Sequence, residues 1–221
     1  MGTLLELEDP VPRLRGELAA RFGLRVDAAA ARRALAAEIT HYRAHMTTGG
    51  CDAAGVRALR TDCARVLRDA LGAPAAPLGL DDLVAALLAS LRFRPFPDAQ
   101  PALRALRQTA GLRLVVASNW DVSLPDVLAD AGLLELVDGV VTSAEAGAGK
   151  PGGAVFARAL TLAQAAPDRA VHVGDSVAED VEGARAAGIV PVLLARGGGA
   201  PPPPPGVRAV HALTELVPPA T

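Results

Sequence analysis

The chain has 221 residues, of which 51% are hydrophobic and 21% are charged, and its formal net charge is -2. This balance excludes an intrinsically disordered chain, and the length suits one globular domain or a core with an inserted lobe. The 22 basic and 24 acidic residues are spread along the chain, which argues against a nucleic-acid partner. No long apolar run and no signal-peptide pattern are present, so we expect a cytoplasmic protein with no membrane partner.

The first half of the chain has the pattern of amphipathic helices. Apolar residues recur at intervals of three and four, β-branched residues are few, and Gly and Pro separate the segments. The pattern predicts a helical lobe built from segments Val11 to Phe22, Asp27 to Thr47, Asp52 to Leu71 and Asp81 to Leu91.

After Pro97, short apolar runs alternate with helical stretches. The predicted strands are Leu112 to Ala117, Val137 to Thr142, Ala170 to Val173 and Ile189 to Leu194. Strands that alternate with helices form a parallel sheet with crossover helices, so we predict an α/β fold with a doubly wound parallel sheet. A Gly- and Pro-rich tract at 197–205 is predicted to be a solvated loop.

Polar residues follow two of these strands directly. Ser118 and Asn119 could hold a phosphate or a carboxylate at the end of their strand, or simply cap the next helix. Gly174 and Asp175 end another strand, with Asp180 in the following helix. Two converging carboxylates suit Mg²⁺, whereas the alternative is a helix cap and a favourable helix-dipole contact.

Lys150 is the single lysine among 22 basic residues, and it stands in a Gly-rich turn before a helix. The other basic residues are all Arg, so a generic surface cation here would be expected to be Arg as well. A compact ammonium fits between oxygens where a planar guanidinium does not. We therefore predict that Lys150 binds a negative group of the substrate.

Together, Ser118-Asn119, Lys150-Pro151 and Gly174 to Asp180, in this order on successive strand ends, resemble motifs two to four of the haloacid dehalogenase superfamily. The resemblance covers nearly the whole chain. It implies a Rossmann-type core formed by residues 1–8 and 93–221, with an inserted helical cap at residues 9–92.

The resemblance also implies roles for single residues. The family attacks its substrate with an Asp and forms a covalent intermediate that water cleaves. Ser118 and Lys150 would be the catalytic residues in this chain, Asn119, Gly2 and Thr3 would join Ser118 in binding the phosphate, and Asp175 with Asp180 would hold Mg²⁺. The implied function is a Mg²⁺-dependent phosphatase of small phosphorylated metabolites, with the phosphorylated small molecule as its partner.

The first motif of the family is only partly present. Alignment on Gly2-Thr3 places the nucleophilic Asp two residues before Met1, and it places Met1 where phosphatases have a second, acidic Asp. Asp9 lies too far along to replace the nucleophile. Two alternatives to the phosphatase stay open: a 2-haloacid dehalogenase, which needs no second Asp, and a non-catalytic binding protein on this scaffold.

The missing part of the first motif includes a strand of the sheet. The strand that precedes the nucleophile lies in the middle of the family's sheet, and its absence would leave backbone groups of two neighbouring strands unpaired. We therefore expect that the chain is unstable, that another segment or a partner's strand fills the place, or that the sheet shows a gap.

Overall fold

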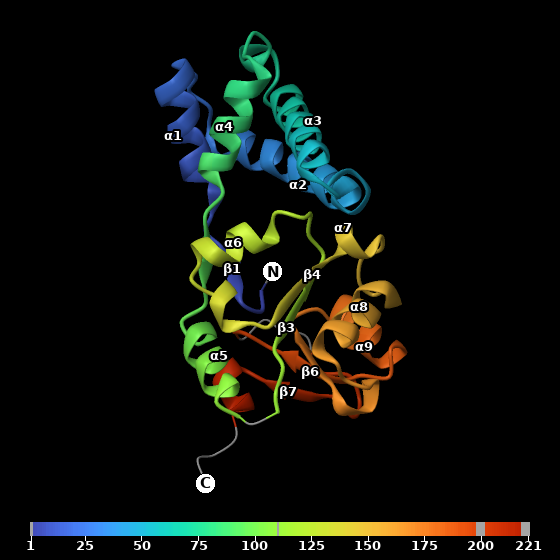
Figure 1. The fold of residues 1–221 in the computed structure, drawn as a ribbon. Helices are drawn as coiled ribbons and strands as arrows, with labels where there is room; N and C mark the ends of the chain where they lie inside the picture. The colour runs from blue at the N-terminus through green and yellow to red at the C-terminus, as the bar shows by residue number, and fades with distance from the viewer. Residues whose placement is uncertain (1, 110, 198–201, 218–221) are drawn as a thin grey trace. The chain divides into compact units, whose positions relative to one another are not determined.

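The computed structural model describes residues 2–109, 111–197 and 202–217. The chain divides into two compact units (Figure 1). The core unit consists of Met1–Glu6 and Arg94–Thr221, and the helical unit consists of Leu7–Phe93. Part of the predicted Gly- and Pro-rich loop, residues 198–201, lies outside the described residues, as does Met1.

The helical unit contains the four helices that the apolar periodicity predicts. They are α1 (Pro10–Phe22), α2 (Ala28–Gly49), α3 (Ala53–Leu71) and α4 (Leu80–Ser90), with the 3₁₀ turn η1 (Ala73–Ala75) between the last two. Asp9, Asp27 and Asp52 cap the first three helices, because each side chain accepts a hydrogen bond from a backbone N–H in the first turn. Among the described residues, none of the helices is both long enough and apolar enough to span a membrane.

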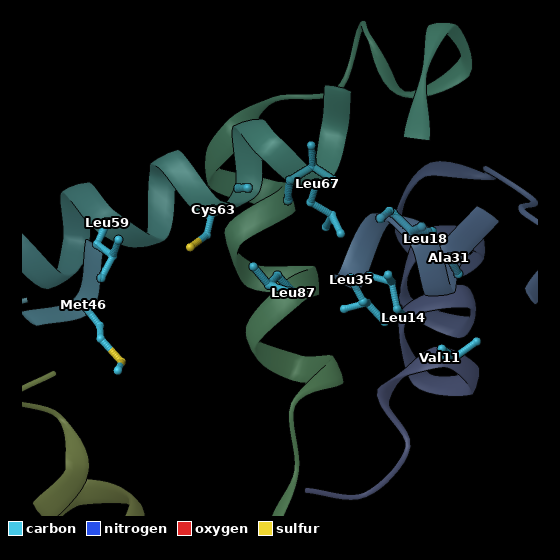
Figure 2. Close-up of a cluster of buried hydrophobic side chains, with 13 residues drawn as sticks. Val11, Leu14, Leu18, Ala31, Leu35, Met46, Leu59, Cys63, Leu67 and Leu87 are labelled. Atoms are coloured by element: carbon cyan, nitrogen blue, oxygen red, sulfur yellow. The ribbon is translucent and has the colours of Figure 1, made fainter. Parts of the chain in front are cut away.

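One apolar cluster holds these four helices together (Figure 2). Leu14, Leu18 and Leu67 are fully buried in it, and Leu35 and Leu87 are each 2% exposed. Burial of a Leu side chain stabilises the fold by about 1.5 to 3 kcal/mol, so this stripe of leucines accounts for the helical pattern read from the sequence.

The core unit has parallel strands with helices on both sides. Strand β3 (Val115–Ser118) pairs with β4 (Gly139–Thr142), and β6 (Val190–Leu194) pairs with both β5 (Val171–Gly174) and β7 (Arg208–Val210), always in parallel. Figure 1 shows α5 (Ala99–Arg107) on one side of the strands and α8 (Gly153–Ala163) with α9 (Glu182–Ala186) on the other. The predicted α/β fold class is confirmed.

Shorter elements complete the core unit. They are α6 (Leu124–Asp130), η2 (Leu134–Leu136), α7 (Ser143–Ala146), η3 (Pro167–Arg169), the π-helical turn η4 (Val177–Val181) and η5 (Leu213–Leu216). The turn η4 stands where the sequence predicts a helix that carries Asp180.

The sheet of the core unit is interrupted. In the described residues β3–β4 and β5–β6–β7 are separate sheets, and no strand pairs with both β3 and β5. The residues along β3 are only half-buried, and Val171 at the start of β5 is 60% exposed, although apolar runs in a parallel sheet are normally buried on both faces. The gap is the third of the outcomes expected for a sheet without its middle strand.

Two short strands that the sequence did not predict connect the units. Strand β1 (Leu5–Leu7) pairs with β2 (Phe93–Pro95). The amide of Phe96 donates to the carbonyl of Leu4 at 3.0 Å, and the amide of Glu8 donates to the carbonyl of Arg92 at 3.0 Å. The residue numbers of the partners run in opposite directions, so the pair is antiparallel.

Candidate active site

The polar residues predicted at the strand ends lie at the carboxyl ends of β3 and β5. Ser118 is the last residue of β3, and Asn119 follows it directly. Gly174 is the last residue of β5, and Asp175 follows it. Lys150 lies in the turn between α7 and α8. Carboxyl ends of parallel strands are where α/β folds bind ligands.

The Lys150 side chain reaches from its turn to strand β3 and to the turn η4 that follows β5. Its Nζ donates to Asp180 Oδ1 at 2.6 Å and to the carbonyl of Ala117, in β3, at 3.0 Å. The side chains of Lys150 and Asp180 are 10% and 5% exposed. The single lysine of the chain is therefore a buried, fixed charge between the two parts of the sheet.

Asp180 has both oxygens occupied by protein donors. Oδ1 accepts from Lys150 and from His172 Nε2 at 2.9 Å, and Oδ2 accepts from the amide of Ser176 at 3.0 Å. Burial alone would raise the pKa of the Asp180 carboxyl, but the hydrogen bond from His172 and the charge of Lys150 outweigh burial and hold the pKa well below its usual range. This arrangement requires Gly174, because a Cβ there would lie 2.1 Å from Asp180 Cγ.

These contacts speak against Asp180 as a Mg²⁺ ligand, the role that the resemblance implies for it. Oδ1 already accepts two hydrogen bonds and Oδ2 accepts one, so most of the acceptor capacity of this carboxylate is used within the protein. Its place in the structure is that of an anchor for Lys150.

Asn119 supports the turn that carries Lys150. Its Oδ1 accepts from the amide of Lys150 at 2.6 Å, and its Nδ2 donates to the carbonyl of Lys150 at 3.0 Å and to Glu179 Oε2 at 3.2 Å. The side chain thus acts as a brace, in place of the phosphate contact expected from the sequence. In the described part of the chain the half-buried Ser118 hydroxyl makes no hydrogen bond to protein, and it remains available to a ligand.

Asp175 is exposed and has a different environment from Asp180. Its Oδ1 accepts from Thr3 Oγ1 at 2.7 Å. The backbone of Gly2, with a φ of +103°, lies so close that a Cβ there would be 2.1 Å from Asp175 Oδ2. Gly2 and Thr3 therefore form a turn against this carboxylate, and Thr3 contacts the acid where the sequence analysis expected it to contact phosphate.

The residues present fit Mg²⁺ through one carboxylate. Asp175 is exposed and its second oxygen is free of hydrogen bonds within the described residues, so it can serve as an oxygen ligand. Mg²⁺ is commonly bound by one or two carboxylates with water and substrate phosphate supplying the rest. No group of three or more His, Cys, Asp or Glu side chains in the described residues forms a complete metal site.

Two residues of this region were missed in the sequence. His172 lies inside a predicted strand, and its spacing from other polar residues indicates no role. In the structure its Nε2 contacts the same Asp180 oxygen as Lys150 does. Arg196 lies just beyond β6, at the same strand ends as Ser118 and Asp175, and its guanidinium contacts the carbonyls of Gly2 and Thr3. Its position after an apolar run was the one available signal.

Comparisons with known proteins agree on one family. A model of the haloacid dehalogenase-like hydrolases matches residues 2–188. The haloacid dehalogenase-like hydrolase domain-containing protein 3 of Bos taurus is 45% identical over 97 residues, 44% of this chain and 38% of that protein. The phosphoserine phosphatase of Thermus thermophilus is 37% identical over 139 residues, 60% of this chain and 54% of that protein.

The fold has solved counterparts. The crystal structure of a HAD phosphatase from Thermococcus onnurineus superimposes with a TM-score of 0.63 at 24% identity, covering 98% of this chain and 92% of that one. This likeness concerns the fold alone. The chain spans about half the length, or less, of the two curated relatives described above.

Proposed function

Because the chain belongs to the haloacid dehalogenase-like hydrolase family, we propose that it is a Mg²⁺-dependent phosphatase of small phosphorylated metabolites. The observation that carries the proposal is the ammonium of Lys150, held at 2.6 Å from Asp180 and 3.0 Å from the carbonyl of Ala117, at strand ends that also carry Ser118 and Asp175. Relatives named as phosphatases of phosphoserine and of glyceraldehyde 3-phosphate support this substrate class.

Each side chain has a role that its contacts allow. Ser118 would donate its hydroxyl to a phosphate oxygen, and Lys150 would neutralise charge on the phosphate as it reacts. Asp175 would hold Mg²⁺, which supplies further neutralisation of the phosphate oxygens. Asp180, His172 and Asn119 would keep Lys150 in place.

The proposed reaction is an aspartyl-phosphate hydrolysis. A carboxylate attacks phosphorus, and the bond from phosphorus to the ester oxygen breaks; this oxygen takes a proton from water and leaves as an alcohol. A second water then cleaves the acyl phosphate, which releases inorganic phosphate and restores the carboxylate. In the family resemblance the attacking Asp precedes Gly2, so the mechanism is proposed for a protein in which an Asp stands before this turn. The helical unit would serve as the cap that selects the substrate and excludes water.

Phosphate binding tests the part of the site that the described residues form. We would titrate the protein with inorganic phosphate, with and without Mg²⁺, by calorimetry, and repeat the titration with Lys150→Arg and Asp175→Asn. Lys150→Arg should weaken phosphate binding because the planar guanidinium does not fit the position of the ammonium. Asp175→Asn should remove the dependence on Mg²⁺.

Arg158→Lys is the matched control, because Arg158 is exposed on α8 and the change exchanges the same two cations in the opposite direction. This variant should bind phosphate like the wild type.

Two assays separate the phosphatase from the dehalogenase: hydrolysis of p-nitrophenyl phosphate, and release of chloride from 2-chloropropionate. Both are run on the chain as it stands and on a chain extended by a strand ending in Asp-x. Chloride release without phosphate release would overturn the proposal.

A further inference from the structure

We infer that Arg196 is a positioning residue for the proposed Mg²⁺ and phosphate site: it holds the turn of Gly2 and Thr3 against the Asp175 carboxylate. That the site binds Mg²⁺ and phosphate rests on the proposed function. That Arg196 holds the turn rests on the contacts described below, and all the residues concerned lie in the core unit.

The Arg196 guanidinium joins two segments that are far apart in the sequence. On one side Nε donates to the carbonyl of Gly2 at 3.2 Å, and Nη2 donates to the carbonyl of Thr3 at 2.9 Å. On the other side Nη1 lies 3.0 Å from Asp98 Oδ2 and Nη2 lies 2.9 Å from Asp98 Oδ1. One planar group thus donates to one oxygen of the Asp98 carboxylate, lies at ion-pair distance from the other, and donates to two consecutive carbonyls.

The surroundings fix the guanidinium in this orientation. Its Cζ lies 4.0 Å from the centre of the Phe96 ring, and the amide of Leu213 donates to Asp98 Oδ2 at 2.7 Å. Burial would raise the pKa of Asp98, but the hydrogen bonds from Arg196 and from the Leu213 amide outweigh burial and lower it, so this partner stays ionised. A lysine has neither the flat face that stacks on Phe96 nor several N–H donors in one plane, so Arg196→Lys keeps the charge but removes these contacts.

The turn that Arg196 holds is the one that touches Asp175. Thr3 Oγ1 donates to Asp175 Oδ1 at 2.7 Å, and the Gly2 backbone leaves no room for a Cβ beside Oδ2. The carbonyls bound by Arg196 belong to these same two residues. Loss of the guanidinium frees the turn, and with it the hydroxyl that orients the Asp175 carboxylate.

The test uses the full chain and the variant Arg196→Lys, with two measurements. Amide hydrogen exchange should become faster in residues 2–8 and around Phe96, whose amide donates to Leu4, while exchange in helices α1 to α4 stays unchanged. Calorimetric titration with Mg²⁺ and inorganic phosphate should show affinity about 10- to 100-fold weaker, as for other residues that orient a metal ligand. Arg158→Lys should change neither measurement.

A double-mutant cycle separates positioning from general loss of structure. If Arg196 acts through Asp175, Arg196→Lys should weaken phosphate binding measured with Mg²⁺ in the wild type, and it should leave the Mg²⁺-independent phosphate affinity of Asp175→Asn unchanged. Unchanged exchange in residues 2–8 would overturn the inference, and so would faster exchange with unchanged affinity. A wild-type protein that binds neither Mg²⁺ nor phosphate would refute the proposed function, and the ligand-positioning role with it, whereas the exchange data would still decide whether Arg196 holds the turn.

Discussion

The buried ion pair of Lys150 and Asp180 should dominate the stability of the core unit around the gap. Asp180→Asn keeps the size of the side chain and removes its charge, so the ammonium of Lys150, whose side chain is 10% exposed, is left without its anion. Removal of one partner of a buried ion pair costs about 3 to 5 kcal/mol, a large part of the roughly 5 to 15 kcal/mol that stabilises a domain. We expect a decrease of that size in the free energy of unfolding at pH 7.

The stability that Asp180 contributes should depend on pH. The pKa of Asp180 is depressed in the folded chain from its usual value of 3.8, so the stability it contributes is present above that pH and is lost as the pH falls below it. Urea unfolding of the wild type and of Asp180→Asn, from pH 7 downward, should show a difference that shrinks once the pH falls below 3.8.

Asp168→Asn is the control for this experiment, because Asp168 is exposed in η3 and its replacement should change stability by less than about 0.5 kcal/mol. A difference between wild type and Asp180→Asn that is below about 1 kcal/mol, or that is the same at every pH, would refute the argument from the buried pair.

Three further outcomes are expected. Burial raises the pKa of Glu38, which is 4% exposed, so the folded chain loses stability as the pH rises above 4.5. Glu38→Gln should remove this loss when thermal unfolding is measured at pH 4.5 and at pH 7. If the variant keeps the pH profile of the wild type, Glu38 is not the group responsible. A Cβ at Gly183 would lie 2.6 Å from Phe156 Cε2, so Gly183→Ala should destabilise the chain by about 1 to 3 kcal/mol in urea, whereas Gly153→Ala, with open space around it, should not. An N-terminal extension of about ten apolar residues ending in Asp-x should pair with the free edges of β3 and β5 and raise the melting temperature. If the chain is equally stable with and without this extension, the alignment on Gly2-Thr3 is wrong.

Local patterns were enough to predict most of the fold. The helices of the helical unit follow from their leucine spacing, with an Asp cap at the start of the first three, and β3 to β6 follow from short apolar runs. Strands β1 and β2 were not predictable in this way, because each has three residues and exists through its pairing with the other. Their stability is a property of contacts between distant segments.

The candidate site was predictable by position more than by contact. The sequence placed Ser118 and Asp175 at strand ends and Lys150 in a turn before a helix, where the structure has them. It gave Asp180 and Asp175 the same role, because spacing does not tell which carboxylate faces Lys150 and which faces solvent. Arg196 could not be assigned a role either, since its partners come from other parts of the chain.

The antiparallel pair of β1 and β2 makes the helical unit an exchangeable module. The chain leaves the core unit after Glu6 and returns at Arg94 through two strands that lie hydrogen-bonded to each other. An excision between Glu8 and Arg92, closed by a two-residue Asn-Gly turn, would therefore convert the pair into an ordinary hairpin without stretching the backbone. The same adjacency lets recombination exchange one helical insert for another of different length while the parallel strands keep their register.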